Sequence, residues 1–440
     1  MARDLFGTDG IRGVAGEPPL DDATVYAAGR ALGELVERLD PHPEVVLGMD
    51  TRESGPHLAR LMAAGLERAG VPARFAGVIP TPGLARLTHA EHFVAGVMLS
   101  ASHNPYQDNG IKIFAHSGYK LPDEQEEQVE QGIGRLRDGG AATRELSIDP
   151  TLADRYIDFL ARCWAGPQGS SRLKLVVDCA NGASYQVAPR LFERLGLAAE
   201  FTANQPDGRN INLNCGSLHL DAVRSRVLET KSDLGVAFDG DADRALFISG
   251  SGREINGDAV LWMAARHLAT PLVVSTTMAN LGLEKALAGE GIGMIRTQVG
   301  DKYVLEEMLR RDAELGGEQS GHVIFRRWAT TGDGLLTALK VLEMVLTTGR
   351  TLDELTASLP VYPQIIRNVR VKGRTPLDQV PAVYQAVERG ERELDGRGRI
   401  IVRYSGTESL IRVMVEAETE EEVDRHATRL VDIISGQLGA

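Results

Sequence analysis

Hydrophobic and polar positions follow one repeated order along most of the chain. A short apolar run ends in a polar turn, and a segment with helical spacing of apolar residues comes next. This order occurs three times, with apolar runs at residues 45–50, 173–178 and 272–275 and helical segments at 56–69, up to 195 and at 281–288. Because β-branched runs that alternate with helices are typical of parallel sheets covered by helices, we predict three related α/β units. Functional groups are expected at the carboxyl ends of the strands.

The C-terminal region has a different pattern. Residues 400–403 and 410–415 are apolar runs that predict two strands, and residues 419–438 have helical spacing. This order is typical of a small α+β domain rather than of another β–α–β unit. We therefore predict an α/β fold with three similar mixed α/β domains and a C-terminal α+β domain.

Polar and turn-forming segments suggest where the domains meet. An acidic stretch and a glycine turn at 138–140 precede the first boundary, a Ser/Gly run at 249–252 marks the second, and Pro360 and Pro363 flank the third. The predicted domains are residues 1–150, 151–250, 251–362 and 363–440.

The composition is that of a folded protein and excludes several classes of function. Of 440 residues, 43% are hydrophobic and 25% are charged, which argues against disorder. The net charge of −13 disfavours a nucleic-acid or anionic-membrane surface, although a few local arginines suffice to bind a small phosphorylated ligand. Three cysteines are too few for a disulfide framework or a Cys-rich zinc site. With no apolar signal-peptide core and no apolar run near the ~20 residues that span a bilayer, we expect a cytoplasmic protein without a membrane partner.

The acidic loop that follows the apolar run 234–238 is the sharpest chemical signal. Asp239, Asp241 and Asp243 stand at alternate positions, so their carboxylates can surround one hard cation such as Mg²⁺. An EF-hand is excluded because its sixth position is Arg244 rather than glycine. A solvated acidic turn is the alternative.

A second signal follows the predicted strand at 93–99. Ser102 would lie on the exposed loop at the end of that strand, with His103 beside it and Lys112 a short way on. These residues supply a nucleophile, a proton acceptor and a cation. Turn chemistry around Asn104 and the following proline explains the same segment equally well. Nearby, Ser117-x-x-Lys120 lacks the partner motifs of a serine–lysine enzyme and is set aside.

Two further loops are suited to phosphate and to sugar hydroxyls. The segment at 403–408, together with Arg412, combines two guanidinium groups with hydroxyls and glycine, a set that binds phosphate; a plain hairpin turn is the alternative. The loop at 316–322 places Glu318 and Ser320 between glycines, which suits a polyhydroxy ligand but is a weak signal by itself.

Taken together, five motifs resemble the α-D-phosphohexomutase superfamily. They are Phe6-Gly7-Thr8-Asp9-Gly10-Ile11-Arg12-Gly13, Ser102-His103-Asn104-Pro105, the Asp239/Asp241/Asp243 loop, Gly317-Glu318-Gln319-Ser320-Gly321-His322 and Arg403-x-Ser405-Gly406-Thr407-Glu408. The resemblance covers essentially the whole chain, in the right order. It implies four domains, three of them similar, each of which contributes one loop to a central cleft.

The resemblance also implies a role for each candidate residue. Ser102 would be the phosphoserine, and its phosphate would complete the shell of one Mg²⁺ ion held by the three aspartates. By the same resemblance, the residues near the transferred phosphoryl group are Arg12, Lys112 and Arg244, with Lys112 as a candidate acid/base, and His103 can shuttle a proton. The residues that contact the sugar phosphate are Glu318, Ser320 and Lys302. The residues that clamp the distal phosphate are Arg403, Ser405, Gly406, Thr407 and Arg412. Lys302 stands where arginine is more usual in the family, and it keeps the positive charge.

The implied reaction moves a phosphoryl group from Ser102 to a sugar monophosphate and back through a 1,6-bisphosphate. The N-terminal motif and Gln319 favour glucosamine 6-phosphate and glucosamine 1-phosphate as substrate and product. Glucosamine 1,6-bisphosphate would then be the intermediate and activator. The product would be used to make UDP-N-acetylglucosamine and cell-wall precursors. A mannose or glucose phosphate mutase, a Mg²⁺-dependent phosphatase and a non-catalytic sugar-phosphate binder are the alternatives. A homodimer is left open.

Overall fold

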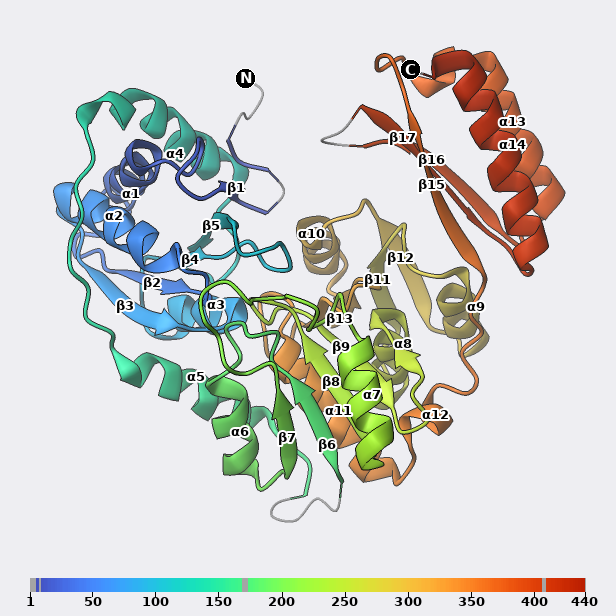
Figure 1. The fold of residues 1–440 in the computed structure, drawn as a ribbon, viewed down its shortest axis with the longest axis horizontal. Coiled ribbons are helices and arrows are strands. Elements are labelled where there is room, and N and C mark those ends of the chain that lie inside the picture. Colours follow the sequence, from blue (N-terminus) through green and yellow to red (C-terminus); the bar gives the residue numbers. More distant parts are fainter. Residues whose placement is uncertain (1–4, 8, 168–172, 406–408, 440) are drawn as a thin grey trace. The chain divides into compact units, whose positions relative to one another are not determined.

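A computed structural model of the chain describes residues 5–7, 9–167, 173–405 and 409–439 (Figure 1). The chain forms two compact units. The first consists of Met1–Met278 with Gly293–Thr356, and the second of Ala279–Ile292 with Ala357–Ala440. No helix within the described residues is both long and apolar enough to cross a membrane.

The first sheet combines parallel and antiparallel strands. Its order is β1-β5-β4-β2-β3, in which β2, β3 and β4 are parallel, while β5 runs antiparallel to β4 and β1 antiparallel to β5. The strands are β1 (Ile11–Val14), β2 (Val45–Met49), β3 (Ala73–Val78), β4 (Ala95–Leu99) and β5 (Asp108–Ala115).

Apolar side chains on both faces of this sheet explain why its strands are continuous hydrophobic runs. Val45 and Leu47 lie in the core on the side of α1, α2 and α4, whereas Val46 between them lies in the core on the side of α3 and α5. Successive side chains of a strand point to opposite faces, so a strand covered on both sides needs apolar residues throughout. The helices are α1 (Asp22–Val36), α2 (Gly55–Arg68), α3 (Thr81–Ala90), α4 (Asp123–Leu136), the 3₁₀ turn η1 (Arg137–Gly139) and α5 (Pro150–Cys163).

The second and third sheets repeat this arrangement. Their orders are β10-β9-β8-β6-β7 and β12-β11-β13-β14, and in each a trio of parallel strands is followed by an antiparallel neighbour. The strands are β6 (Leu175–Asp178), β7 (Ala199–Thr202), β8 (Leu234–Phe238), β9 (Ala245–Ser249), β10 (Glu254–Ile255), β11 (Leu272–Thr276), β12 (Gly293–Thr297), β13 (Leu315–Gly317) and β14 (Val323–Phe325). The helices are α6 (Val187–Leu195), α7 (Asp221–Thr230), α8 (Gly257–Leu268), α10 (Asp301–Arg311), α11 (Gly334–Thr348) and α12 (Leu352–Leu355).

The repeated topology places three loops at equivalent positions. In each sheet a loop leaves the carboxyl end of the third parallel strand and returns along the antiparallel neighbour: β4 to β5, β8 to β9 and β13 to β14. These loops carry Ser102, the three aspartates and Glu318, respectively. Carboxyl ends of parallel strands are where α/β sheets bind ligands.

The second unit is built on a three-stranded antiparallel sheet with the order β15-β17-β16. Val413 and Val415 of β17 share a core with Leu430 and Ile434 of α14, and α14 begins after Thr419, whose side chain accepts a hydrogen bond from Glu422 N. The elements are α9 (Leu281–Gly289), β15 (Gln364–Arg370), the 3₁₀ turn η2 (Leu377–Gln379), α13 (Pro381–Leu394), β16 (Arg399–Tyr404), β17 (Leu410–Glu416) and α14 (Glu420–Leu438).

Helix α9 is bound to this unit although it comes early in the chain. Asn280 accepts a hydrogen bond from Tyr362 N at 3.0 Å and donates one to Tyr362 O at 2.9 Å. Leu281 N donates to Glu416 Oε1 at 3.1 Å. The predicted fold class, three mixed α/β domains and a C-terminal α+β domain, is confirmed.

Candidate functional site

Ser102 is held in direct contact with the acidic loop of the second sheet. Its hydroxyl donates to Asp239 Oδ2 at 2.5 Å, and His103 Nδ1 lies 3.3 Å from Ser102 Oγ. Ser102 is buried and has φ of +52°, in the left-handed region that non-glycine residues adopt at a cost. Strained backbone of this kind is common at active sites. The nucleophile interpretation therefore explains the conformation of Ser102 better than a plain turn does.

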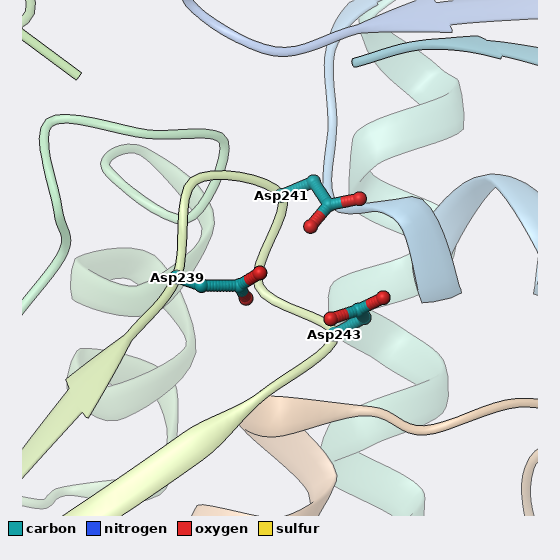
Figure 2. A group of neighbouring side chains, drawn as sticks. All are labelled: Asp239, Asp241 and Asp243. Atoms are coloured by element: carbon teal, nitrogen blue, oxygen red, sulfur yellow. The ribbon is translucent and has the colours of Figure 1, made fainter. Parts of the chain in front are cut away.

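The carboxylates of Asp239, Asp241 and Asp243 lie near one another along one loop (Figure 2). Each offers a ligand oxygen within 4.8 Å of the others, and all three side chains are buried. Asp241 Oδ2 accepts hydrogen bonds from Thr81 Oγ1 at 2.6 Å and from Lys112 Nζ at 2.8 Å. Within the described residues, Oδ1 of Asp241 and Oδ1 of Asp243 are buried and have no hydrogen-bond partner. Buried carboxylate oxygens with unused lone pairs fit a hard divalent cation, and the alternative of a solvated turn is wrong.

The charges of this loop also favour a bound cation. Burial, together with the carboxylates of Asp243 and Asp241, raises the pKa of Asp239 well above its usual value. Like charges that are close together in a buried site disfavour ionisation of one of them. A cation between the three oxygens would remove this repulsion.

A pocket of about 430 Å³ lies beside the two loops. Arg12, His103 and Arg244 line it, and so do Glu318 and Ser320 from the third sheet. The Nε atoms of Arg12 and Arg244 are buried and make no hydrogen bond within the described residues. Guanidinium donors of this kind suit an anion such as phosphate, which arginine binds through two parallel hydrogen bonds. With Asp243, which also lines the pocket, the structure brings together six of the predicted residues around one space.

The loop between β13 and β14 is a tight turn whose side chains enter the pocket. Glu318 N donates to His322 O at 2.9 Å, and Glu318 Oε1 accepts from Gly300 N at 3.2 Å. Gly321 has φ of +93°, and a Cβ there would lie 2.5 Å from Ala245 O, so the turn requires glycine.

Two histidines of the pocket have pKa values that are shifted in opposite directions. Burial favours a neutral His322, but the Asp243 carboxylate and its hydrogen bond outweigh it and raise the pKa of His322 to about 9. Burial, aided by Arg244 and Arg12, lowers the pKa of His103 to about 4. At neutral pH His103 is therefore uncharged.

Two lysines, the predicted Lys112 and Lys120, bind the carboxylates around the site. Lys120 Nζ donates to Asp9 Oδ1 and to Asp301 Oδ2, both at 2.6 Å, and so links the first and third domains. Buried Lys112 lies 3.3 Å from Asp9 as well as against Asp241. Although burial favours the neutral amine, these carboxylates raise the pKa of Lys112 above its usual value, and the group is an ammonium that neutralises charge. Asp9, Lys120, Asp301 and His322 were not among the predicted site residues. Asp9 and His322 belong to two of the five family motifs, whereas Lys120 lies in the Ser117-x-x-Lys120 segment, which belongs to none of them.

Some of the predicted residues are not in the lining of this pocket. Lys302 is not among the residues that line it, and its ammonium group is paired with Asp123 of α4. Arg403 and Arg412 face each other on neighbouring strands of the second unit, and Ser405 N donates to Leu410 O at 2.9 Å. Gly406 and Thr407 lie outside the described residues.

Gly240 of the acidic loop lies against the main chain of Ser102. Its substitution by alanine should therefore reduce turnover. A Cβ at Gly240 would lie 2.4 Å from Ser102 O, so the two loops must move apart. Displacement of reacting groups by about 1 Å costs on the order of 10²-fold in rate, and we expect kcat of Gly240→Ala to fall by about that factor. Gly134→Ala is the control, because a Cβ there meets nothing within 4 Å. A Gly240→Ala enzyme that retained wild-type kcat would contradict the close approach.

Four family models match the chain in succession. They describe phosphoglucomutase/phosphomannomutase alpha/beta/alpha domain I at residues 3–138, domain II at 154–252, domain III at 256–362 and the C-terminal domain at 367–433.

Full-length relatives and solved structures agree with these matches. The chain is 53% identical to a phosphoglucosamine mutase of Solibacter usitatus over 450 residues, with 100% of both chains covered. It is similar to the crystal structure of a phosphoglucomutase/phosphomannomutase family protein of Burkholderia thailandensis, with a TM-score of 0.80, 25% identity, and 98% of this chain and 99% of that chain covered. It also shares the fold of Aspergillus fumigatus N-acetylphosphoglucosamine mutase, solved in complex with GlcNAc-6P and magnesium, with a TM-score of 0.62, 18% identity, and 99% of this chain and 96% of that chain covered.

Proposed function

Since the chain belongs to the phosphoglucomutase/phosphomannomutase family, we propose that it interconverts glucosamine 6-phosphate and glucosamine 1-phosphate. It is an enzyme of the isomerase class, and its full-length relatives at 45–53% identity are phosphoglucosamine mutases. The product is the amino-sugar phosphate from which UDP-N-acetylglucosamine is made.

One observation carries the proposal. The Ser102 hydroxyl lies 2.5 Å from a carboxylate of the acidic loop, next to a pocket lined by the guanidinium groups of Arg12 and Arg244, whose Nε atoms are buried. Phosphoryl transfer depends mainly on in-line positioning and on neutralising the charge of the transferred group. The site supplies both, with a fixed oxygen on Ser102 and cations on Arg12 and Arg244.

The three aspartates and the phosphate on Ser102 are suited to hold one Mg²⁺ ion. The unused oxygens of Asp241 and Asp243 and the charge repulsion at Asp239 support this assignment. When bound, Mg²⁺ would neutralise the phosphoryl oxygens and make the phosphorus more electrophilic.

The chain's own residues account for the rest of the reaction. A substrate hydroxyl attacks the phosphorus of phospho-Ser102, the bond from phosphorus to Ser102 Oγ breaks, and that oxygen keeps the electron pair. The substrate oxygen loses its proton and the serine oxygen regains one, which gives glucosamine 1,6-bisphosphate and a free hydroxyl. After the sugar turns over, its other phosphoryl group returns to Ser102 by the same exchange. Bisphosphate that escapes can phosphorylate a free Ser102, so it also activates the enzyme.

The C-terminal unit is suited to hold the phosphate that does not react. Arg403 and Arg412 are directly opposite each other in the register of β16 and β17, and like charges in this position repel unless an anion lies between them. Burial, together with Arg412, lowers the pKa of Arg403. We assign Arg403, Ser405 and Arg412, with Gly406 and Thr407, to this clamp.

Replacement of Arg412 by alanine should act mainly on substrate binding. Loss of a charge-assisted hydrogen bond to phosphate corresponds to about a 10- to 100-fold rise in KM for glucosamine 1-phosphate. Arg367→Ala is the control, because Arg367 belongs to the same sheet but binds Asp424 and Thr428 of α14. An Arg412→Ala enzyme with wild-type KM would remove this residue from the clamp.

A substrate panel tests the proposed function. Purified enzyme with Mg²⁺ and a trace of glucosamine 1,6-bisphosphate would be assayed with the 1-phosphates of glucosamine, glucose and mannose. We expect the highest kcat/KM with glucosamine 1-phosphate and no matching release of inorganic phosphate. A preference for mannose or glucose 1-phosphate would contradict the choice of sugar, and release of phosphate as fast as substrate is lost would indicate a phosphatase instead.

A further inference from the structure

Arg52 has no assigned role in the reaction, yet it makes more hydrogen bonds to the Ser102 loop than any other described side chain for which bonds are given. It follows the carboxyl end of β2, which pairs with β4, and its guanidinium group is fully buried. Nε donates to Asp50 Oδ2 at 2.8 Å. Nη2 donates to Ser102 O and to Asn104 O, both at 2.9 Å, and Nη1 donates to Asp108 O at 3.0 Å and to Pro105 O.

These contacts use all five N–H donors of the guanidinium group. One binds a carboxylate, which compensates the buried charge, and four bind main-chain carbonyls of the segment from Ser102 to Asp108. Lysine carries three donors on a single atom and cannot span acceptors spread over seven residues. The geometry is therefore specific to arginine.

A second domain repeats two of these bonds. Asn212 Nδ2, in the second α/β domain, donates to Ser102 O at 2.9 Å and to Asn104 O at 3.1 Å. From the other side of the loop, Ser100 Oγ accepts from Ser102 N at 2.9 Å and donates to Asp50 Oδ2 at 2.6 Å. The main chain of Ser102 is thus fixed at both its N–H and its carbonyl.

We infer that Arg52 is a positioning residue, which holds the Ser102 main chain in its left-handed conformation so that Oγ returns to the same place after each phosphoryl transfer. The inference rests on the proposed function, in which Ser102 loses a phosphoryl group and regains one in every cycle. A loop free to relax from φ of +52° would move Oγ away from Asp239. Asn212 supports the same conformation from the neighbouring domain.

Arg52→Lys is the decisive variant, because it keeps the positive charge next to Asp50 but removes the guanidinium group that spans the carbonyls of the Ser102 loop. We expect kcat to fall by about 10- to 100-fold, since sub-ångström positioning of the nucleophile is lost. KM for glucosamine 1-phosphate and the Kd for Mg²⁺ should stay within about twofold of wild type, because Arg52 is not among the residues that line the pocket. Hydrogen–deuterium exchange should rise in the peptide that contains residues 100–108.

Arg74→Lys is the matched control. Arg74 belongs to the same domain, is paired with Asp149 and lies over the ring of Phe93, so its substitution makes the same chemical change without touching the Ser102 loop. The inference is overturned if Arg52→Lys keeps kcat within about twofold of wild type, if Arg74→Lys loses as much, or if KM rises in proportion.

Asn212→Gly keeps the inference testable should Arg52→Lys fail to fold. Asn212 has φ of +59°, which glycine adopts freely, and glycine removes only the two donated bonds. A three- to tenfold fall in kcat (on the order of one lost positioning bond) at unchanged KM supports the inference, and unchanged kcat overturns it. Ser102→Ala distinguishes failure of the proposed function from failure of the role of Arg52. If Ser102→Ala remains active, the proposed function itself is wrong. If Ser102→Ala is inactive and Arg52→Lys is fully active, only the role of Arg52 is wrong.

Discussion

Ser102→Ala is expected to lose about 10⁴-fold or more in kcat while it keeps its fold. The side-chain oxygen is the only atom removed, and in the proposed mechanism it is the atom that carries the phosphoryl group. Loss of a covalent nucleophile leaves only what binding and electrostatics provide. The removed hydroxyl donates one hydrogen bond, to Asp239, so the effect on thermal unfolding should be small. Initial rates with glucosamine 1-phosphate and a thermal melt measure both.

Intact mass with peptide mapping gives this prediction a readout that does not depend on turnover. Wild-type enzyme incubated with glucosamine 1,6-bisphosphate should carry one phosphate on Ser102, and Ser102→Ala should carry none. Ser117→Ala is the control, because Ser117 is an exposed serine in the same domain. Turnover or phosphate retained by Ser102→Ala would refute the phosphoserine mechanism, and so would a phosphate mapped to another residue.

Asp241→Asn is expected to weaken Mg²⁺ binding by about 10²-fold or more and to lower activity in parallel. The substitution keeps the shape of the side chain but removes one of three buried charges that can face the cation. An amide in this place would also meet Lys112 Nζ, which needs an acceptor at 2.8 Å. Mg²⁺ at 100 times its Kd stabilises a protein by about 2.7 kcal/mol. Thermal melts over a Mg²⁺ titration therefore measure the loss without an assay of activity.

Asp233→Asn serves as the matched control for this substitution. Asp233 immediately precedes β8, at the end opposite the acidic loop, is exposed, and accepts a hydrogen bond from Lys174 N. The same chemical change there should leave both the Mg²⁺-dependent shift in Tm and the activity as they are in wild type. If Asp241→Asn showed the same Mg²⁺ dependence as wild type, the three aspartates would not be the metal ligands.

Site residues could be predicted from the sequence where they directly follow a buried strand. Ser102 and the three aspartates each come within a few residues of a continuous apolar run, and a run of that kind identifies a strand covered on both faces. The structure adds that β4, β8 and β13 are equivalent strands in three sheets of the same topology. That equivalence explains why the nucleophile, the metal loop and the sugar loop each follow the third parallel strand of a sheet.

Contacts between distant segments could not be predicted from local patterns. Lys120 meets partners 111 and 181 residues away, and the motif around it has no local signal of its own. Arg52 is separated by 50 residues from Ser102, and its segment predicts only a turn before a helix. The assignment of Lys302 stays a prediction: its residue type suits phosphate, and in this structure its ammonium group is paired with Asp123.

The place of α9 has a consequence for chimeric enzymes. The chain passes between the two compact units three times, at residues 278–279, 292–293 and 356–357. A chimera that took only residues 363–440 from a relative would pair a foreign Glu416 with a native Leu281 amide, and a foreign strand would meet the helix that Asn280 begins. Exchange of the C-terminal domain between mutases should therefore carry residues 279–292 with it, so that the helix and the sheet on which it rests come from the same parent.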